Sequence, residues 1–154
     1  MPASDATSPS PDPRLQALYQ ELILDHYRRP RNHGALEHPD AEVEQRNPSC
    51  GDIIRLQVAF EGDAVRALRF AGQGCAISQA SASMMTQLLQ GKSSEEVEQL
   101  ARRFTAMVHG DAEASRDAAL GDLRALAGVS RLPSRHGCAL LPWKALAAAL
   151  ARHA

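Results

Sequence analysis

A hairpin pattern within an otherwise helical sequence is the feature that most restricts the fold. The side chains at positions 54, 56, 58 and 60 are apolar and alternate with those at 55, 57 and 59, which is the period of a half-buried strand. A turn at residues 61–63 (EGD) follows, and residues 64–70 return as the second arm. Residues 41–46 form a further short candidate strand. We therefore expect a small antiparallel sheet of three strands.

Helical patterns precede and follow this sheet. Asp12 and Pro13 are typical of an N-cap followed by proline at the first helical position, and Pro30 stops the helix that they open. After the sheet, four more helices are predicted, over residues 75–90, 93–110, 120–126 and 141–152. Because proline disturbs a helix interior, the last of these should begin at or just before Pro142. This order predicts an α+β fold with a small three-stranded antiparallel sheet and helices packed on one face.

Length and charge set the broad class of the protein. The 154 residues suit a single domain, expected over residues 13–152 after a disordered tail at residues 1–12 that is rich in proline and serine. The 17 basic and 18 acidic residues nearly cancel, so we expect no nucleic-acid partner. No apolar run approaches the roughly 18 residues that span a bilayer, and residues 1–13 show no secretory signal. We expect a cytoplasmic protein with no membrane partner.

Three cysteines are the main candidates for chemistry, and their odd number and wide spacing argue against a disulfide framework. Cys50 lies in a predicted turn beside Gly51, whereas Cys75 and Cys138 lie at predicted helix entrances, where N–H groups and the helix dipole favour a thiolate. With the carboxylate of Asp52, the three sulfurs suit a four-coordinate divalent metal such as zinc. From spacing alone, packing as a small buried hydrophobe is an equal alternative for any one cysteine.

Three ordered motifs, each containing one cysteine, carry a resemblance to a known family. They are NPSCGD at residues 47–52, GQGCAIS and ASASMM within residues 72–85, and RHGCAL and WKAL within residues 135–146. Together with LYQELILDHY at residues 18–27, they resemble the U-type iron–sulfur cluster assembly proteins. The resemblance covers about residues 15–150, which is essentially the whole predicted domain.

Two branches of that family differ near the third cysteine. The scaffold branch has a histidine immediately before it, where this chain has Gly137, and it has a chaperone-docking motif that LPSR at residues 132–135 replaces here. Arg135, three positions before the cysteine, matches the Suf-type branch. The chain is thus identified as a member of the Suf-type, zinc-dependent sulfurtransferase branch.

The resemblance implies a metal site and a partner. The zinc ligands would be Cys50, Asp52, Cys75 and Cys138. Cys50 would accept persulfide sulfur from a pyridoxal-phosphate cysteine desulfurase, and Arg135 would contact the persulfide or the partner. The sulfur would then pass to the downstream iron–sulfur assembly machinery. The alternative is a scaffold that binds iron and assembles a [2Fe–2S] cluster on the same residues.

Other conspicuous residues are predicted to be structural. His26 is expected to be a packed, hydrogen-bonded histidine, and His136 a bystander of the metal site. The sequence GQG at residues 72–74 lacks the continuation of a phosphate-binding loop. A basic cluster at residues 28–31 is more simply a solvated surface than a docking patch. Apolar core positions are expected at Met84, Met85 and Trp143.

Overall fold

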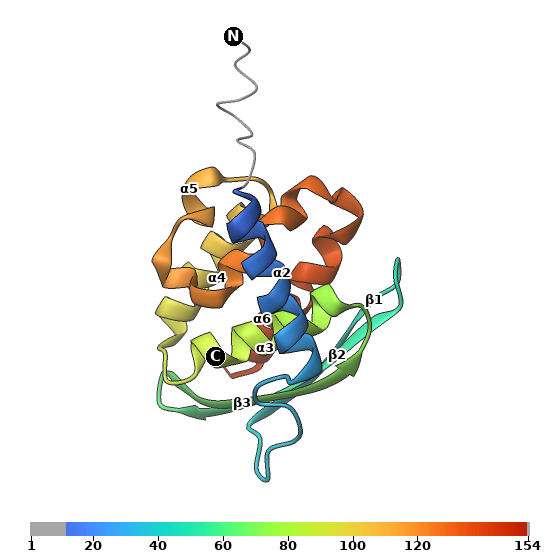
Figure 1. The fold of residues 1–154 in the computed structure, drawn as a ribbon. Coiled ribbons are helices and arrows are strands. Elements are labelled where there is room, and N and C mark those ends of the chain that lie inside the picture. The colour runs from blue at the N-terminus through green and yellow to red at the C-terminus, as the bar shows by residue number, and fades with distance from the viewer. Residues whose placement is uncertain (1–11, 154) are drawn as a thin grey trace.

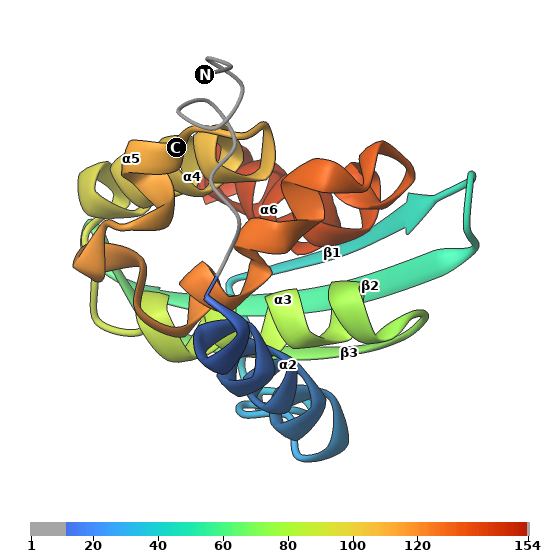
Figure 2. The same cartoon turned by 45° about the horizontal axis from the view of Figure 1, so that its top comes forward.

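The helices lie on one side of a single sheet in the computed structural model, which describes residues 12–153 (Figure 1, Figure 2). The strands are β1 (Ala41–Asn47), β2 (Asp52–Glu61) and β3 (Ala64–Gln73). The α-helices are α2 (Pro13–Arg28), α3 (Ala76–Leu89), α4 (Ser94–Val108), α5 (Ala112–Ser115) and α6 (His136–His153), and two 3₁₀ segments are η1 (Ala118–Arg131) and η2 (Pro133–Arg135). The α+β prediction is confirmed. The tail predicted at residues 1–12 lies outside the described residues, except for Asp12.

The sheet has the order β1-β2-β3, with both pairs antiparallel. Within β2, Ile54, Leu56 and Val58 are fully buried, whereas Arg55 between them is exposed, as the alternation predicts. The register pairs Asn47 with Asp52 across the β1–β2 turn. This pairing brings the turn that carries Cys50 to one end of the sheet.

Several helix ends follow from local sequence chemistry. The Asp12 side chain caps α2 by accepting the N–H of Arg14 at 2.9 Å. Ser93 and Glu96 form the reciprocal capping box at the start of α4. Gly91, which follows α3, has a φ of +86°, a left-handed conformation that glycine adopts without steric cost.

The predicted start of the last helix is wrong. Helix α6 begins at His136 and runs through Pro142. Proline at position 142 has no N–H to donate to the carbonyl of Cys138, four residues earlier, so the helix forms in spite of a missing hydrogen bond. Burial compensates, because Leu141, Pro142 and Trp143 all pack in the interior.

The segment after α4 also differs from prediction. Residues 118–131 form the 3₁₀ segment η1, where a helix over 120–126 was expected, and the short α5 that precedes it has no counterpart in the prediction. The backbone breaks inside η1 at Gly121, whose φ is +55° and ψ −132°. A left-handed residue interrupts the helical ladder, so a long regular helix cannot form there.

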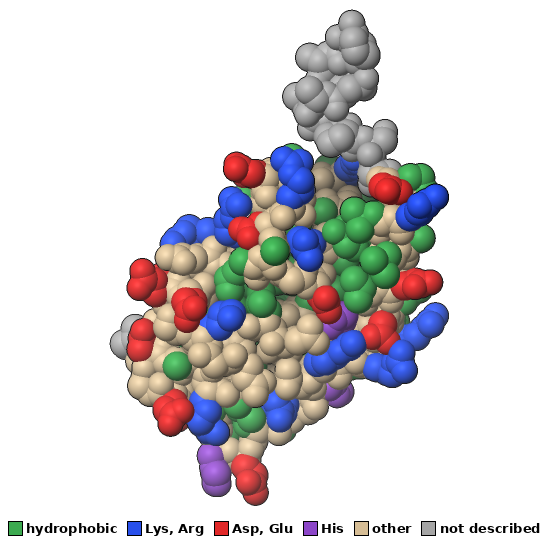
Figure 3. Space-filling model, turned by 60° about the vertical axis from the view of Figure 1, so that its left-hand side comes forward, with side chains coloured by type: hydrophobic (Ala, Val, Ile, Leu, Met, Phe, Trp, Pro, Cys, Tyr) green, Lys and Arg blue, Asp and Glu red, His purple; other side chains and the backbone are tan. Residues whose placement is uncertain are grey.

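The core lies between the helices and the sheet, and Met84, Met85 and Trp143 are buried in it as predicted. Trp143 stacks on Phe104 with ring centroids 5.1 Å apart. On the face shown in Figure 3, acidic and basic side chains are interspersed without a large field of one sign. Among the helices described, none combines the length and the apolar character needed to cross a membrane.

Candidate metal centre

Three chain junctions meet at one end of the sheet. The β1–β2 turn and the junction between β3 and α3 lie at this end in both views (Figure 1, Figure 2), because Asp52 pairs with Asn47 and Ile53 pairs with Gln73. The start of α6 supplies the third junction, since Cys138 contacts Cys50 across 88 positions of sequence. Each of the three cysteines therefore comes from a different junction.

Asp52 is the centre of the cluster, with only 1% of its surface exposed. Its Oδ1 accepts the backbone N–H of Cys75 at 2.9 Å. Its Oδ2 lies 2.9 Å from the Cys50 sulfur and 3.6 Å from the Cys75 sulfur. One carboxylate thus contacts two of the thiols and the backbone at the start of α3.

The three thiols differ in exposure. Cys138 is fully buried, Cys75 is half-buried and Cys50 is exposed. The sulfurs of Cys50 and Cys138 are 3.2 Å apart. The donor atoms of Cys50, Asp52 and Cys138 all lie within 4.8 Å of one another, and Cys75 joins this group through Asp52. The structure brings all four predicted ligand residues together.

Two glycines make this convergence sterically feasible. Gly51 has a φ of +75°, so the turn that separates Cys50 from Asp52 needs a residue that tolerates the left-handed region. A Cβ on Gly74 would lie 2.1 Å from Asp52 Oδ1, far inside van der Waals contact. The carboxylate therefore occupies the space that any side chain at position 74 would fill.

Burial and hydrogen bonding shift the pKa of the Asp52 carboxylate in opposite directions. Burial favours a raised pKa for Asp52, but hydrogen bonds from the Cys50 thiol and the Cys75 N–H outweigh it and hold the pKa of Asp52 below its usual value. Burial raises the pKa of the Cys138 thiol well above its usual range, and its contacts with Cys50 and Asp52 raise it further. A bound divalent cation would reverse the preference of the thiol, because a coordinated thiol is deprotonated outright.

Two neighbours of Cys138 have different surroundings. Arg135 is exposed on η2, and its pKa is raised first by hydrogen bonding with the Cys138 thiol and then by the charge of Cys75. The His136 ring is engaged elsewhere, since its Nε2 lies 3.2 Å from the Ser130 carbonyl and its ring meets that of His109 edge-on. Arg135 therefore faces the cluster, whereas His136 has its partners outside it.

The donor set fits zinc. Three thiols and one carboxylate supply four donors of the types that bind zinc in tetrahedral sites. A harder cation such as magnesium or calcium would instead require a shell of oxygen atoms. Cys50, Asp52, Cys75 and Cys138 are therefore suited to hold zinc.

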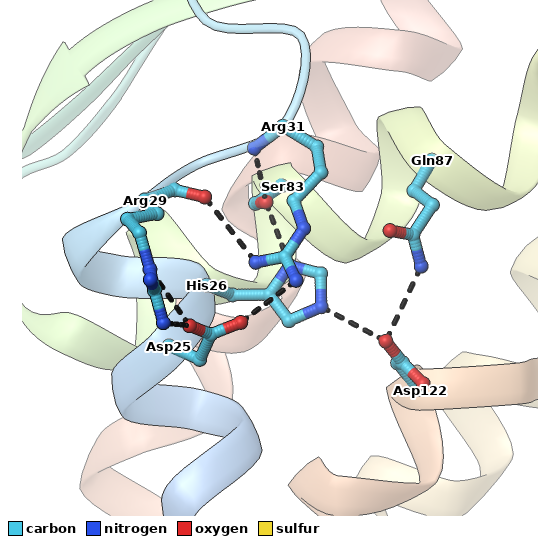
Figure 4. Close-up of polar contacts among 7 residues, drawn as sticks. All are labelled: Asp25, His26, Arg29, Arg31, Ser83, Gln87 and Asp122. Atoms are coloured by element: carbon cyan, nitrogen blue, oxygen red, sulfur yellow. Dashed lines mark hydrogen bonds and ion pairs between the residues drawn. The ribbon is translucent and has the colours of Figure 1, made fainter.

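A second polar cluster lies outside this site and contains His26 (Figure 4). The ring is fully buried, with Nδ1 2.7 Å from Ser83 Oγ and Nε2 2.9 Å from Asp122 Oδ2. The prediction of a packed, hydrogen-bonded histidine is confirmed. Arg29 and Arg31 both pair with Asp25, so one carboxylate offsets one of their two positive charges.

Sequence reasoning missed two residues. Asp122 is 96 positions from His26, and no local pattern could have paired them. Asn47 appears in the sequence analysis only as the first residue of the NPSCGD motif, although its side chain contacts Ser49 and Cys138. A local signal for this role was present in the sequence. Asn47 precedes Pro48 in the predicted turn, and asparagine side chains often hydrogen-bond the backbone two residues on.

Comparison with known proteins gives the family of the chain. Residues 18–152 match the model of the NifU-like N terminal domain. The zinc-dependent sulfurtransferase SufU of Bacillus subtilis (strain 168) is 46% identical over 138 residues, covering 90% of this chain and 92% of that protein. The iron–sulfur cluster assembly scaffold protein IscU of Streptococcus pyogenes serotype M1 is 45% identical over 141 residues, covering 92% and 87% respectively.

Solved structures agree. A protein of Fervidobacterium islandicum AW-1, described as an iron–sulfur cluster assembly scaffold for the SUF system, superimposes with a TM-score of 0.79 at 35% identity, covering 88% of this chain and 98% of that one. A NifU-like N-terminal protein from Brucella abortus gives a TM-score of 0.78 at 22% identity, covering 88% and 94%, and this likeness concerns the fold alone.

Proposed function

We propose, from the premise that this chain belongs to the family of the NifU-like N-terminal domain, that it is a zinc-dependent sulfur acceptor in iron–sulfur cluster assembly. One observation carries the proposal. The donor atoms of Cys50, Asp52 and Cys138 lie within 4.8 Å of one another, Cys75 joins them through its contact with Asp52, and Cys50 is the exposed residue of the four. An exposed ligand on a turn is accessible to the persulfide of a partner protein.

The four residues divide into two groups. Cys75 and Cys138 are attached to the starts of helices α3 and α6, and Asp52 is the first residue of β2. Cys50 alone lies on a turn, where motion is least costly. We assign Cys75, Cys138 and Asp52 as ligands that stay and Cys50 as the ligand that leaves. Zinc, when bound, would keep the thiols deprotonated at neutral pH, and coordination of the sulfur lone pairs would shield them from oxidation.

The transfer step follows thiol–disulfide chemistry. The Cys50 thiolate attacks the outer sulfur of a persulfide on the cysteine desulfurase. A new sulfur–sulfur bond forms at Cys50, the sulfur–sulfur bond on the desulfurase breaks, and the desulfurase cysteine leaves as a thiolate. The sulfur changes carrier without net oxidation, so the step requires no further oxidant or reductant. Arg135, which is exposed beside Cys138, would stabilise the anionic persulfide or contact the partner.

A scaffold that assembles a [2Fe–2S] cluster on the same residues is the second candidate. It is favoured by the similarity to the Streptococcus pyogenes scaffold protein. Gly137 weighs against it, because this chain offers no imidazole at the position before the third cysteine, where the scaffold branch has one. Both candidates place the chain in iron–sulfur cluster assembly, and we propose the cytoplasm as its location.

Metal analysis separates the two functions. The protein is expressed without iron supplementation, purified without a chelating step, and analysed for zinc, iron and acid-labile sulfide. A sulfur acceptor should contain about one zinc per chain and no sulfide. A coloured iron–sulfide species at similar stoichiometry would instead establish the scaffold.

A further inference from the structure

Asn47, the last residue of β1, organises the turn that carries Cys50. Its backbone carbonyl accepts the N–H of Gly51 at 2.8 Å and that of Cys50 at 3.3 Å. Its side-chain Oδ1 accepts the N–H of Ser49 at 3.2 Å. Three successive N–H groups of the turn are therefore fixed by one asparagine.

The orientation of the Asn47 amide follows from these contacts. Because Oδ1 is held by the N–H of Ser49, the Nδ2 end must point the other way, and it lies 3.9 Å from the Cys138 sulfur. A flipped amide would set two N–H donors against each other, so the hydrogen-bond network fixes the assignment. The amide therefore donates an N–H to the buried sulfur of the site.

Gly137 provides the space for this amide. A Cβ at position 137 would lie 3.0 Å from Asn47 Nδ2, closer than ordinary van der Waals contact. Gly137 lies inside α6 and does not have a positive φ, so its backbone conformation does not require glycine. The contact with Asn47 thus gives a physical reason for glycine immediately before Cys138.

We propose that Asn47 is a positioning residue that makes the two neighbouring sulfurs of Cys50 and Cys138 unequal. A thiolate that accepts an N–H donates less electron density to a metal and is a weaker nucleophile. The amide thus holds Cys138 in place as a buried ligand, while the same residue shapes the turn that presents Cys50. This inference rests on the proposed metal site, and it adds the residue that determines which of two sulfurs, 3.2 Å apart, reacts.

Cobalt(II) bound in place of zinc tests this role spectroscopically, because the thiolate-to-cobalt charge-transfer band reports the electron density on the sulfurs. Asn47→Asp keeps the acceptor for Ser49 but removes the N–H donor, and Asn47→Ser removes the reach of the side chain. Asn32→Asp is the matched control. Its amide also donates to one side chain, Thr86, and accepts from another, Arg69, and among the contacts described it touches none of the four ligands.

Both Asn47 variants should shift the charge-transfer band to longer wavelength. Asn47→Ser, which adds no charge beside the metal, should also weaken cobalt binding about 10- to 100-fold, the usual effect of losing a hydrogen bond to a metal ligand. Asn32→Asp should leave the band unchanged. If both Asn47 variants bind one cobalt per chain with the wild-type spectrum, Asn47 only shapes the turn and the inference is wrong. Failure of the wild-type protein to bind cobalt or zinc would overturn the proposed metal site itself, and that outcome is recognised before any variant is made.

Discussion

Two polar clusters in this molecule each contain a partly or fully buried aspartate, but they differ in what surrounds it. Around His26, each donor meets an acceptor: Ser83 Oγ accepts the Arg31 N–H at 2.8 Å and can donate to His26 Nδ1, which leaves Nε2 to donate to Asp122 (Figure 4). Around Asp52, one carboxylate contacts the thiols of Cys50 and Cys75, and the Cys138 sulfur lies against that of Cys50, the exposed residue. The first cluster is complete within the protein. The second cluster instead gathers ligand atoms that can bind a metal ion.

The hydrogen-bonded series Ser83–His26–Asp122 has the residue types of a hydrolytic triad, but it is not a hydrolytic site here. His26 and Ser83 are fully buried, so no substrate reaches the hydroxyl. The network joins α2 and α3 to η1, and its role is to fix these elements together. The metal centre lies where the chain turns and where glycines leave room for ligands.

Removing the Asp52 carboxylate should have the largest effect on metal binding. If the binding free energy of a structural zinc, about 10–16 kcal/mol, is shared among four ligands, Asp52→Ala should weaken zinc binding roughly 100- to 1,000-fold. Competition with a chromogenic chelator measures this affinity. Asp122→Asn, which alters a carboxylate of the other cluster, serves as the control and should keep wild-type affinity. Wild-type affinity in Asp52→Ala would refute the four-ligand assignment.

Truncating His26 should instead affect folding. His26→Ala leaves a cavity and deprives both Ser83 and Asp122 of a partner, so the free energy of unfolding should fall by about 3 kcal/mol. His26→Gln, which keeps a donor and an acceptor, should lose less. Urea unfolding measures both variants, and zinc content should stay near one per chain. Loss of zinc with unchanged stability would show that the two clusters are not separate in function.

A methyl group at position 74 should disturb the metal centre alone. Gly74→Ala places a Cβ 2.1 Å from Asp52 Oδ1, so the carboxylate must move, and zinc binding should weaken about 10- to 100-fold. The matched control is Gly62→Ala, in the β2–β3 turn, because its φ of +60° is also positive but a Cβ there meets nothing within 4 Å. Equal zinc affinities in the two variants would mean that the contact between a Cβ at position 74 and Asp52 does not affect the metal site.

The sequence anticipated features that depend on near neighbours. The strand alternation holds as predicted over residues 54–58 and breaks at Ala59, which is buried beside a shift in the β2–β3 register. The cap at Asp12 is also found as predicted, and it involves only residues close in the chain. The four clustered ligand residues came from a resemblance, since spacing alone left each cysteine ambiguous.

The remaining features depend on tertiary contacts. Pro142 forbids a helix by its local chemistry, but burial of its neighbours outweighs one lost hydrogen bond. The pairing of Asp122 with His26 joins segments that only the folded chain brings together. The same holds for Asn47 and Cys138, which are 91 positions apart.

The smallest expected effect concerns pH. Hydrogen bonds from His26 and Gln87 outweigh burial and hold the pKa of Asp122 below its usual value, with the charge of Arg31 adding to the effect. The ionised carboxylate therefore stabilises the fold above the unfolded-state pKa of about 3.9, and this contribution is lost as pH falls through the lower folded-state pKa. Because the side chain is 36% exposed, solvent screening limits the contribution to about 1 kcal/mol.

Unfolding of wild type and Asp122→Asn between pH 5 and pH 2.5 tests this sign. The wild-type advantage should shrink toward the acid end. An advantage that grows with acidity would show that the folded state favours the protonated carboxyl.

Locating the transferred sulfur tests the central claim most directly. The zinc-loaded protein is incubated with a cysteine desulfurase, pyridoxal phosphate and cysteine, alkylated, and digested for mass spectrometry of the three cysteine peptides. The account predicts a gain of about one sulfur atom, on the peptide that contains Cys50, and its loss in Cys50→Ala. Sulfur found mainly on Cys75 or Cys138 would contradict the assignment of Cys50 as the ligand that leaves.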